Sequence, residues 1–291
     1  MARKFIDEVR DAIGTSLPTT SGIVNVALEA MYSSSSSAID LARIIEHDPP
    51  LSAKMITVAN SAFYSSYSKI TTVQRAIVIL GFNTVREILS TLPVLHYFFS
   101  TANTDTIDRP GLWYHSVGAG RAAQIIAEII NSDHKTHAYS IGLLHDIGRI
   151  FLALSFPKHY RGVVAMAADK QCRITLAEQK LLKIDHTAIG DMLCEAWNMP
   201  EEIRSAVYYH HDLRGTSIQS HFEPRLCHLA DHLSRKAAIG NPGDSLVPEP
   251  SRAAMHILGK TAERIQKNYD LAFERLKKQR LPISQFYERL K

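Results

Sequence analysis

The sequence has little cysteine, and this scarcity excludes two classes of protein. Only three cysteines occur among 291 residues, at Cys172, Cys194 and Cys227. Their odd number and wide spacing argue against a disulfide framework and against a structural zinc site built from thiolates. They are expected to be small buried thiols in a reducing compartment.

Long apolar segments are absent as well. No run of 18 or more apolar residues occurs, and Asp7 and Glu8 stand where a secretory signal would need its apolar stretch. Apolar residues nevertheless make up 45% of the chain, which excludes a largely disordered protein. The sequence therefore predicts a cytoplasmic protein with a buried core and no membrane partner.

Positive charge is modest and unevenly placed. The net charge is +4, but residues 252–291 hold ten basic and four acidic side chains, whereas the remainder holds 23 and 25. The main body thus lacks the basic surface that phosphate backbones require, and nucleic acid is disfavoured as a partner.

Strand signals are also missing, while apolar residues recur with a helical period along most of the chain. Residues 38–47 and 112–130 follow this period, and residues 200–210 open with Pro200 and two acids, a typical helix start. No Asn-Gly or Asp-Gly turn separates two alternating segments. These patterns predict an all-α protein.

Breaks in the pattern suggest the organisation of the chain. Two helical blocks are expected, followed by a proline-rich linker and a basic amphipathic helical tail; their predicted bounds are 11–104, 105–238, 239–251 and 252–291. The tail either packs on the body with a solvated basic face or binds an acidic partner or a second subunit.

Histidine is the residue in surplus. The chain has 14, of which 12 lie between His115 and His256. The segment GLLHDIGRI places His145 directly before Asp146, and adjacent residues on a helix point about 100° apart. Both can reach one metal ion only if other segments supply further ligands.

Several segments offer such ligands. The candidate metal-binding residues are His115, His145, Asp146, His186, His210, His211 and Asp231. Imidazole and carboxylate without thiolate suit one or two ions of Fe, Mn, Zn, Ni or Co. Such a site can support hydrolysis of phosphoesters, with Asp146 as a bridging ligand.

Arg149 follows His145 by one helical turn and can hold a phosphate oxygen. The other histidines have simpler interpretations. His96, His159 and His256 are expected to be hydrogen-bonded core residues, and His228 and His232, which flank Asp231 at helical spacing, can be surface residues.

The ordered set His115, His145–Asp146 and Asp231 resembles the H…HD…D pattern of the HD superfamily of metal-dependent phosphohydrolases. Within it, residues 11–235 resemble the HDOD subgroup, the HD-related output domains. The N-terminal part carries this resemblance in SLPTTSGIVNVALEAM, IEHDPPLSAKMITVANSAFY and ITTVQRAIVILGFNTVREI.

The resemblance implies a two-lobed helical fold whose second lobe is an HD bundle. It also implies a bacterial signalling role with protein partners and generally no established catalysis. The related HD-GYP phosphodiesterases cleave cyclic di-GMP, and their motif positions fall on the seven candidate ligands. After His211, however, this chain reads DLRGTS in place of their Glu and Gly-Tyr-Pro segment, and Arg149 stands where they usually have lysine.

Three functions remain open from the sequence. The first is a non-enzymatic signalling module of the HDOD type, and the second is a metal-dependent phosphohydrolase acting on a nucleotide, a cyclic dinucleotide or another phosphoester. The third is a nucleic-acid-associated regulator that uses the basic tail. The partner, the upstream signal and the oligomeric state are not indicated by any motif.

Overall fold

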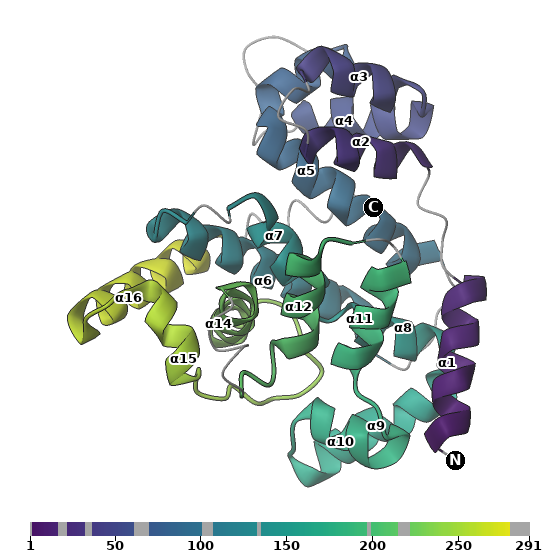
Figure 1. Cartoon of the computed structure of the whole chain (residues 1–291), viewed down its shortest axis with the longest axis vertical. Helices are drawn as coiled ribbons and strands as arrows, with labels where there is room; N and C mark the ends of the chain where they lie inside the picture. The colour runs from purple at the N-terminus through teal and green to yellow at the C-terminus, as the bar shows by residue number, and fades with distance from the viewer. Residues whose placement is uncertain are drawn as a thin grey trace. The chain divides into compact units, whose positions relative to one another are not determined.

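The computed structural model is helical throughout the part of the chain that it describes (Figure 1). The described residues are 2–16, 22–32, 37–60, 70–100, 107–132, 135–196, 199–214 and 222–279. No strand occurs among them, which confirms the all-α prediction. Within the same residues, every helix is too short or too polar to cross a membrane.

The chain forms two compact units. The smaller comprises Pro18–Ser100, and the larger combines Met1–Leu17 with Thr101–Lys291. The N-terminal helix therefore groups with the larger unit, whereas the predicted N-terminal block of 11–104 included its second half.

The described residues of the smaller unit form a bundle of four helices. They are α2 (Gly22–Tyr32), α3 (Ala38–Glu46), α4 (Pro49–Ala59) and α5 (Val73–Ser100). Ser37 begins α3 with a reciprocal capping box to Asp40, and the Asp48 side chain caps α4. Buried Leu41, Ile45 and Met55 contribute to the core of this bundle.

The larger unit contains the remaining helices. They are α1 (Ala2–Ser16), α6 (Arg109–Ile129), α7 (Lys135–Leu144), α8 (Ile147–Ser155), α9 (Pro157–Lys170), α10 (Ile174–Leu182), α11 (His186–Ala196), α12 (Glu201–Tyr209), α14 (Phe222–Lys236), α15 (Arg252–Met255), the 3-10 turn η1 (His256–Leu258) and α16 (Ala262–Lys278). Pro200 precedes α12 as its N-cap residue, because its extended ψ of 149° lies outside the helix.

Two central helices organise this unit. Helix α6 packs against α7, α14 and α16, and α14 also contacts α7 and α12 (Figure 1). Both helices are buried along most of their length, which α6 achieves with many small residues. Polar groups on α6 and α14 are consequently held inside the bundle.

A close helix approach places two of the candidate site segments together. Helices α8 and α11 pack against each other, and a Cβ atom on Gly148 would overlap the carbonyl oxygen of His186. Glycine at this position therefore lets the start of α8, next to Asp146, meet the start of α11.

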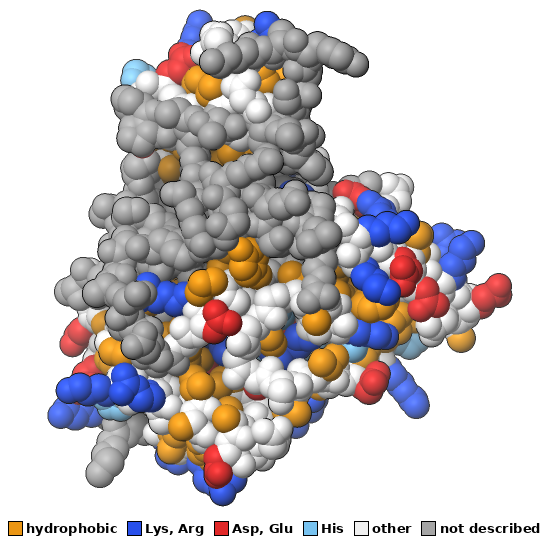
Figure 2. Space-filling view, turned by 180° about the vertical axis from the view of Figure 1, so that it is seen from behind, with side chains coloured by type: hydrophobic (Ala, Val, Ile, Leu, Met, Phe, Trp, Pro, Cys, Tyr) orange, Lys and Arg blue, Asp and Glu red, His pale blue; other side chains and the backbone are white. Residues whose placement is uncertain are grey.

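The basic tail contains a packed helix. Tyr269, Ala272 and Leu276 form the buried side of α16, which contacts α6. On its exposed side, Lys and Arg side chains are interspersed with acidic ones, as the projection at the right of Figure 2 shows. The described part of the tail thus packs on the larger unit, and acidic side chains interrupt its basic face.

Candidate metal centre

The seven candidate ligands come from five segments of the larger unit. His115 lies in the middle of α6, His145 and Asp146 form the turn between α7 and α8, and His186 is the first residue of α11. The pair His210–His211 follows α12, and Asp231 lies in α14. Segments separated by up to 116 positions in the chain therefore converge on one site.

Their donor atoms lie close together. Asp231 Oδ1 is 3.0 Å from His115 Nε2 and 3.7 Å from His145 Nε2. Asp146 is central, because its Oδ1 lies 3.2 Å from His186 Nε2 and its Oδ2 lies 3.4 Å from His145 Nε2.

Two overlapping groups have suitable geometry to hold an ion. The first is Asp146, His186, His210 and His211, and the second is His115, His145 and Asp146. In each group, the ligand atoms lie within 4.8 Å of one another. Asp146 belongs to both, which is the arrangement expected of a carboxylate that bridges two ions.

Most of these residues are removed from solvent, yet their inward-facing atoms have no hydrogen-bond partner. This holds for the Nε2 atoms of all five histidines and for Asp146 Oδ1. Buried polar atoms are normally satisfied, and a cluster of six such atoms in one place needs an explanation. A cation bound between them would satisfy them together, so the residues fit a metal site.

In His145 and His210, the hydrogen bond made by Nδ1 determines which ring nitrogen is free to bind a metal ion. His145 Nδ1 donates to the carbonyl oxygen of Gly142 at 2.7 Å, and His210 Nδ1 donates to that of Val207 at 2.8 Å. A carbonyl can only accept, so the proton stays on Nδ1 and the Nε2 lone pair points inward. This is the tautomer that a metal ligand requires.

The charge states of the candidate ligands also suit a cation. Burial alone would raise the pKa of Asp146, but His145 and Arg149 hold it well below the usual range. Burial, followed by the proximity of His145 and His186, lowers the pKa of His210 to about 3. Asp146 is therefore ionised and His210 neutral at neutral pH.

His186 differs because it lies between two carboxylates. Its Nδ1 is 2.7 Å from Glu178 Oε2, and the backbone N–H of His186 donates to the same oxygen at 3.0 Å. Burial opposes its charged form, but Glu178 and Asp146 raise the pKa of His186 to about 10. A metal ion would have to displace this proton, with Glu178 then orienting the neutral ring.

Glu178 is a site residue that the sequence did not suggest. It is fully buried, and it also accepts a hydrogen bond from the hydroxyl of Tyr160 at 2.9 Å. Its only signal in the sequence is its position eight residues before His186, which by itself predicts no contact. The side chain needs the turn between α10 and α11 to reach the imidazole.

Replacing Glu178 with glutamine is expected to weaken metal binding by about 10- to 100-fold, the usual effect of losing a carboxylate behind a ligating histidine. Metal affinity would be measured by isothermal titration calorimetry. Asp191→Asn is the matched control, because Asp191 is on α11 but pairs with Arg204. Equal affinities for Glu178→Gln and the control would show that Glu178 does not support a metal ligand.

Arg149 occupies a different environment from the one expected of a phosphate-binding residue. Its guanidinium donates to Asp146 Oδ2 at 3.0 Å, to the Tyr160 hydroxyl at 3.2 Å and to the carbonyl oxygen of Pro242. The side chain is only 1% exposed. In this arrangement Arg149 fixes Asp146, and the predicted grip on a phosphate would require those contacts to rearrange.

Asp231 has an arginine of its own, which the sequence also did not suggest. Arg235 lies one turn further along α14 and donates to Asp231 Oδ1 at 2.8 Å. The same guanidinium donates to Asp244 Oδ1 at 2.7 Å and to the carbonyl oxygen of Leu246 at 3.2 Å.

The two histidines that flank Asp231 do not lie free at the surface. His232 is buried, donates from Nδ1 to the Pro248 carbonyl oxygen at 2.9 Å and lies 2.7 Å from the Tyr269 hydroxyl. His228 is half-buried and donates to the carbonyl oxygen of His210 at 2.7 Å. The surface prediction is therefore wrong for His232, because α14 is a central helix with no fully solvated side.

Comparison with known proteins places this fold among HD-related output domains. The model of the HDOD domain family matches residues 17–213, which is most of the chain. One solved structure with this fold is that of an HDOD domain protein of unknown function from Geobacter sulfurreducens. It is 24% identical to this chain with a TM-score of 0.77, and the alignment covers 97% of this chain and 94% of that protein.

Two further solved structures share the fold. A candidate signal transduction protein from Marinobacter aquaeolei VT8 has 21% identity and a TM-score of 0.79, with 98% of this chain and 65% of that protein covered. A candidate phosphohydrolase from Shewanella amazonensis SB2B has 19% identity and a TM-score of 0.71, with 97% and 98% covered. The chain spans about a third of the length of a curated relative, an uncharacterized protein of Treponema pallidum, with 22% identity over 181 residues.

Proposed function

The chain belongs to the HDOD family, and from this premise we propose that it is a cytoplasmic bacterial signalling module that acts through protein partners. In this proposal the larger unit carries a metal centre that stabilises or reports a signalling state. The ligands are His115, His145, Asp146, His186, His210, His211 and Asp231. They hold one or two divalent ions of Fe, Mn, Zn, Ni or Co.

The observation that carries the metal centre is the cluster of inward-facing donor atoms without hydrogen-bond partners. Nitrogen and oxygen donors of this kind suit first-row transition metals. The fold shared with the candidate signal transduction protein supports the signalling role.

Poor access to the site favours signalling over hydrolysis. His115, His145, Asp146, His186 and His210 are all fully buried. Arg149, the residue best suited to a substrate phosphate, is already engaged with Asp146, Tyr160 and Pro242. A phosphoester would find neither an exposed ion nor a free guanidinium in this arrangement.

A metal-dependent phosphohydrolase is the second candidate, and the two ligand groups that share Asp146 support it, as does the fold shared with the candidate phosphohydrolase. A bound ion would supply Lewis-acid stabilisation of a phosphoryl oxygen. Within the chain, Asp146 would contribute a carboxylate to both ligand groups, and Glu178 would hold the His186 ring in place.

A hydrolysis screen separates the two candidates. Protein loaded with Mn²⁺ or Fe²⁺ would be incubated with nucleotides, cyclic dinucleotides and a generic phosphoester, and its metal content measured in parallel. The signalling proposal predicts bound metal and no turnover. Turnover that disappears in Asp146→Ala would overturn that proposal and establish the phosphohydrolase.

A further inference from the structure

A non-helical segment after α14 runs back along that helix. This strap comprises residues 241–251, and four side chains of α8 and α14 bind it. Arg149 donates to the Pro242 carbonyl oxygen, and Arg235 donates to the Asp244 carboxylate and to the Leu246 carbonyl oxygen. Further along the strap, His232 donates to the Pro248 carbonyl oxygen, and His228 accepts a hydrogen bond from the Ser251 N–H.

The order of these contacts shows how the strap lies. As the strap advances from Asp244 to Ser251, its partners on α14 move back from Arg235 through His232 to His228. The strap therefore runs antiparallel to α14 along one face of the helix. That face is next to the one that carries Asp231.

The two arginines connect the strap with the candidate metal centre. Each guanidinium binds one carboxylate of the centre, Arg149 binding Asp146 and Arg235 binding Asp231. Each also binds the strap, Arg149 through one acceptor and Arg235 through two. The Asp244 carboxylate is only 6% exposed, and the Arg235 side chain only 4%. The strap thus supplies a buried anion and two carbonyl oxygens to groups that also bind the centre.

We propose that the strap is a removable cover and that Asp244 takes the place of a phosphoryl group of a ligand. The ligand belongs to the class of phosphate esters or inorganic phosphate, and Arg235 binds its oxygens once the strap has moved. Guanidinium groups bind carboxylate and phosphate in the same forked geometry, so one can replace the other. Strap closure and ligand binding therefore exclude each other.

The energetics favour an exchange over simple opening. If the strap moved away with nothing in its place, N–H donors of both arginines would lose their acceptors. Because these donors lie close to the protein interior, their loss of hydrogen bonds would cost free energy. A ligand with several anionic oxygens would satisfy those donors. The open form is consequently stable mainly when such a ligand is present.

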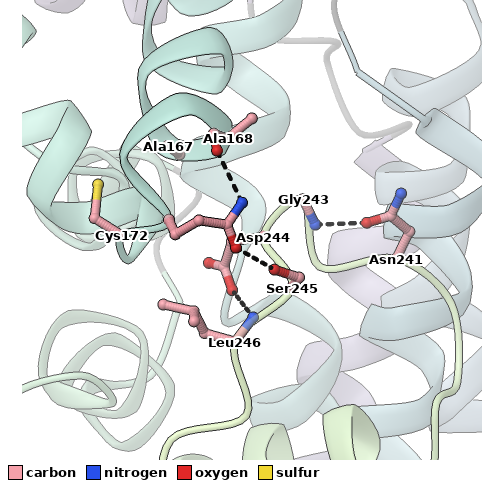
Figure 3. Close-up of a pocket in the computed structure, with 9 residues that line it drawn as sticks. Ala167, Ala168, Cys172, Asn241, Gly243, Asp244, Ser245 and Leu246 are labelled. Carbon is pink, nitrogen blue, oxygen red and sulfur yellow. Dashed lines mark hydrogen bonds between the residues drawn. The ribbon is translucent and has the colours of Figure 1, made fainter.

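The other side of the strap has room for movement. A cavity of about 340 Å³ lies between the strap and the end of α9, lined by Ala168, Cys172, Asn241 and strap residues 243–246 (Figure 3). Gly243 sits in the left-handed region with φ of 79°, and a Cβ atom there would overlap the Arg149 guanidinium. The strap can therefore lie against Arg149 only because residue 243 is glycine.

The test compares phosphate binding and strap exposure in the full chain treated with EDTA, so that it does not depend on the proposed metal centre. Inorganic phosphate would be titrated by calorimetry into the unmodified chain, Asp244→Asn and Asp244→Asn/Arg235→Gln. Ser245→Ala is the control, because Ser245 is an exposed strap residue. Hydrogen exchange of the amides of residues 243–247 would report strap opening.

Asp244→Asn removes the competing anion, so we expect about a tenfold gain in phosphate affinity, the equivalent of one charge-assisted hydrogen bond. Faster exchange in the strap should accompany this gain. Arg235→Gln should abolish the gain, and Ser245→Ala should behave like the unmodified chain.

Faster exchange without tighter phosphate binding would overturn the proposal and leave the strap as a structural connection. A gain that survives Arg235→Gln would overturn it too, because the phosphate would then bind elsewhere. If Asp244→Asn does not fold, Gly243→Ala provides the second variant, since its added methyl group displaces the strap from Arg149; it should also bind phosphate more tightly.

Discussion

Asp146→Ala is expected to abolish metal binding by this chain. Asp146 belongs to both ligand groups, and its two oxygens lie within 3.4 Å of His145 Nε2 and His186 Nε2. Its removal takes away the shared ligand and a negative charge within 4.0 Å of His115, His145 and His186. The loss of affinity should exceed the roughly hundredfold effect of removing a residue that only supports a ligand.

The measurement is metal content by mass spectrometry together with a calorimetric titration. His159→Ala serves as the matched control. The core prediction for His159 is wrong, because the residue is exposed and packs beside Phe5 and Phe156, apart from the ligand cluster. This variant should retain metal. Equal metal loss in Asp146→Ala and His159→Ala would show that the assignment of ligands is wrong.

Arg149→Ala is expected to cause the largest loss of folding stability among single changes at the site. The substitution removes the arginine partner of the buried Asp146 carboxylate and takes a donor from Tyr160 and from Pro242. Breaking a buried ion pair in this way costs about 3–5 kcal/mol in the free energy of unfolding. A bound cation would compensate the charge of Asp146, so the loss should shrink when metal is present.

Urea unfolding with EDTA and with saturating metal measures both effects. The control is Arg204→Ala, which breaks an ion pair with Asp191 whose side chains are 25% and 26% exposed. That change should cost no more than about 1 kcal/mol, with or without metal. An Arg149→Ala variant as stable as Arg204→Ala would refute the buried role of Arg149.

Local sequence signals predicted the helices well because helix formation depends on near neighbours. The capping serine before α3 and the apolar side of α16 can both be recognised within a few residues. The seven candidate ligands were predicted from their residue types in separate segments, and their order then matched the pattern of a known family. The structure brings these seven residues together, while their role as ligands remains a proposal.

The supporting residues could not be predicted, because each acts across a turn or between distant segments. Glu178 reaches His186 around the end of α10, and Arg235 meets Asp244 only after the chain reverses direction. His232 was expected at the surface because helices usually have a polar side. A central helix such as α14 is buried on several sides, so helical periodicity alone does not reveal its exposure.

X-ray absorption spectroscopy of the full chain loaded with one transition metal tests the central claim most directly. The proposed centre predicts a first shell of nitrogen and oxygen, with the outer-shell scattering of several imidazole rings and no sulfur. Asp146→Ala should lose this spectrum. A sulfur shell, or an ion surrounded by water without imidazole scattering, would contradict the assignment of a histidine–aspartate metal centre.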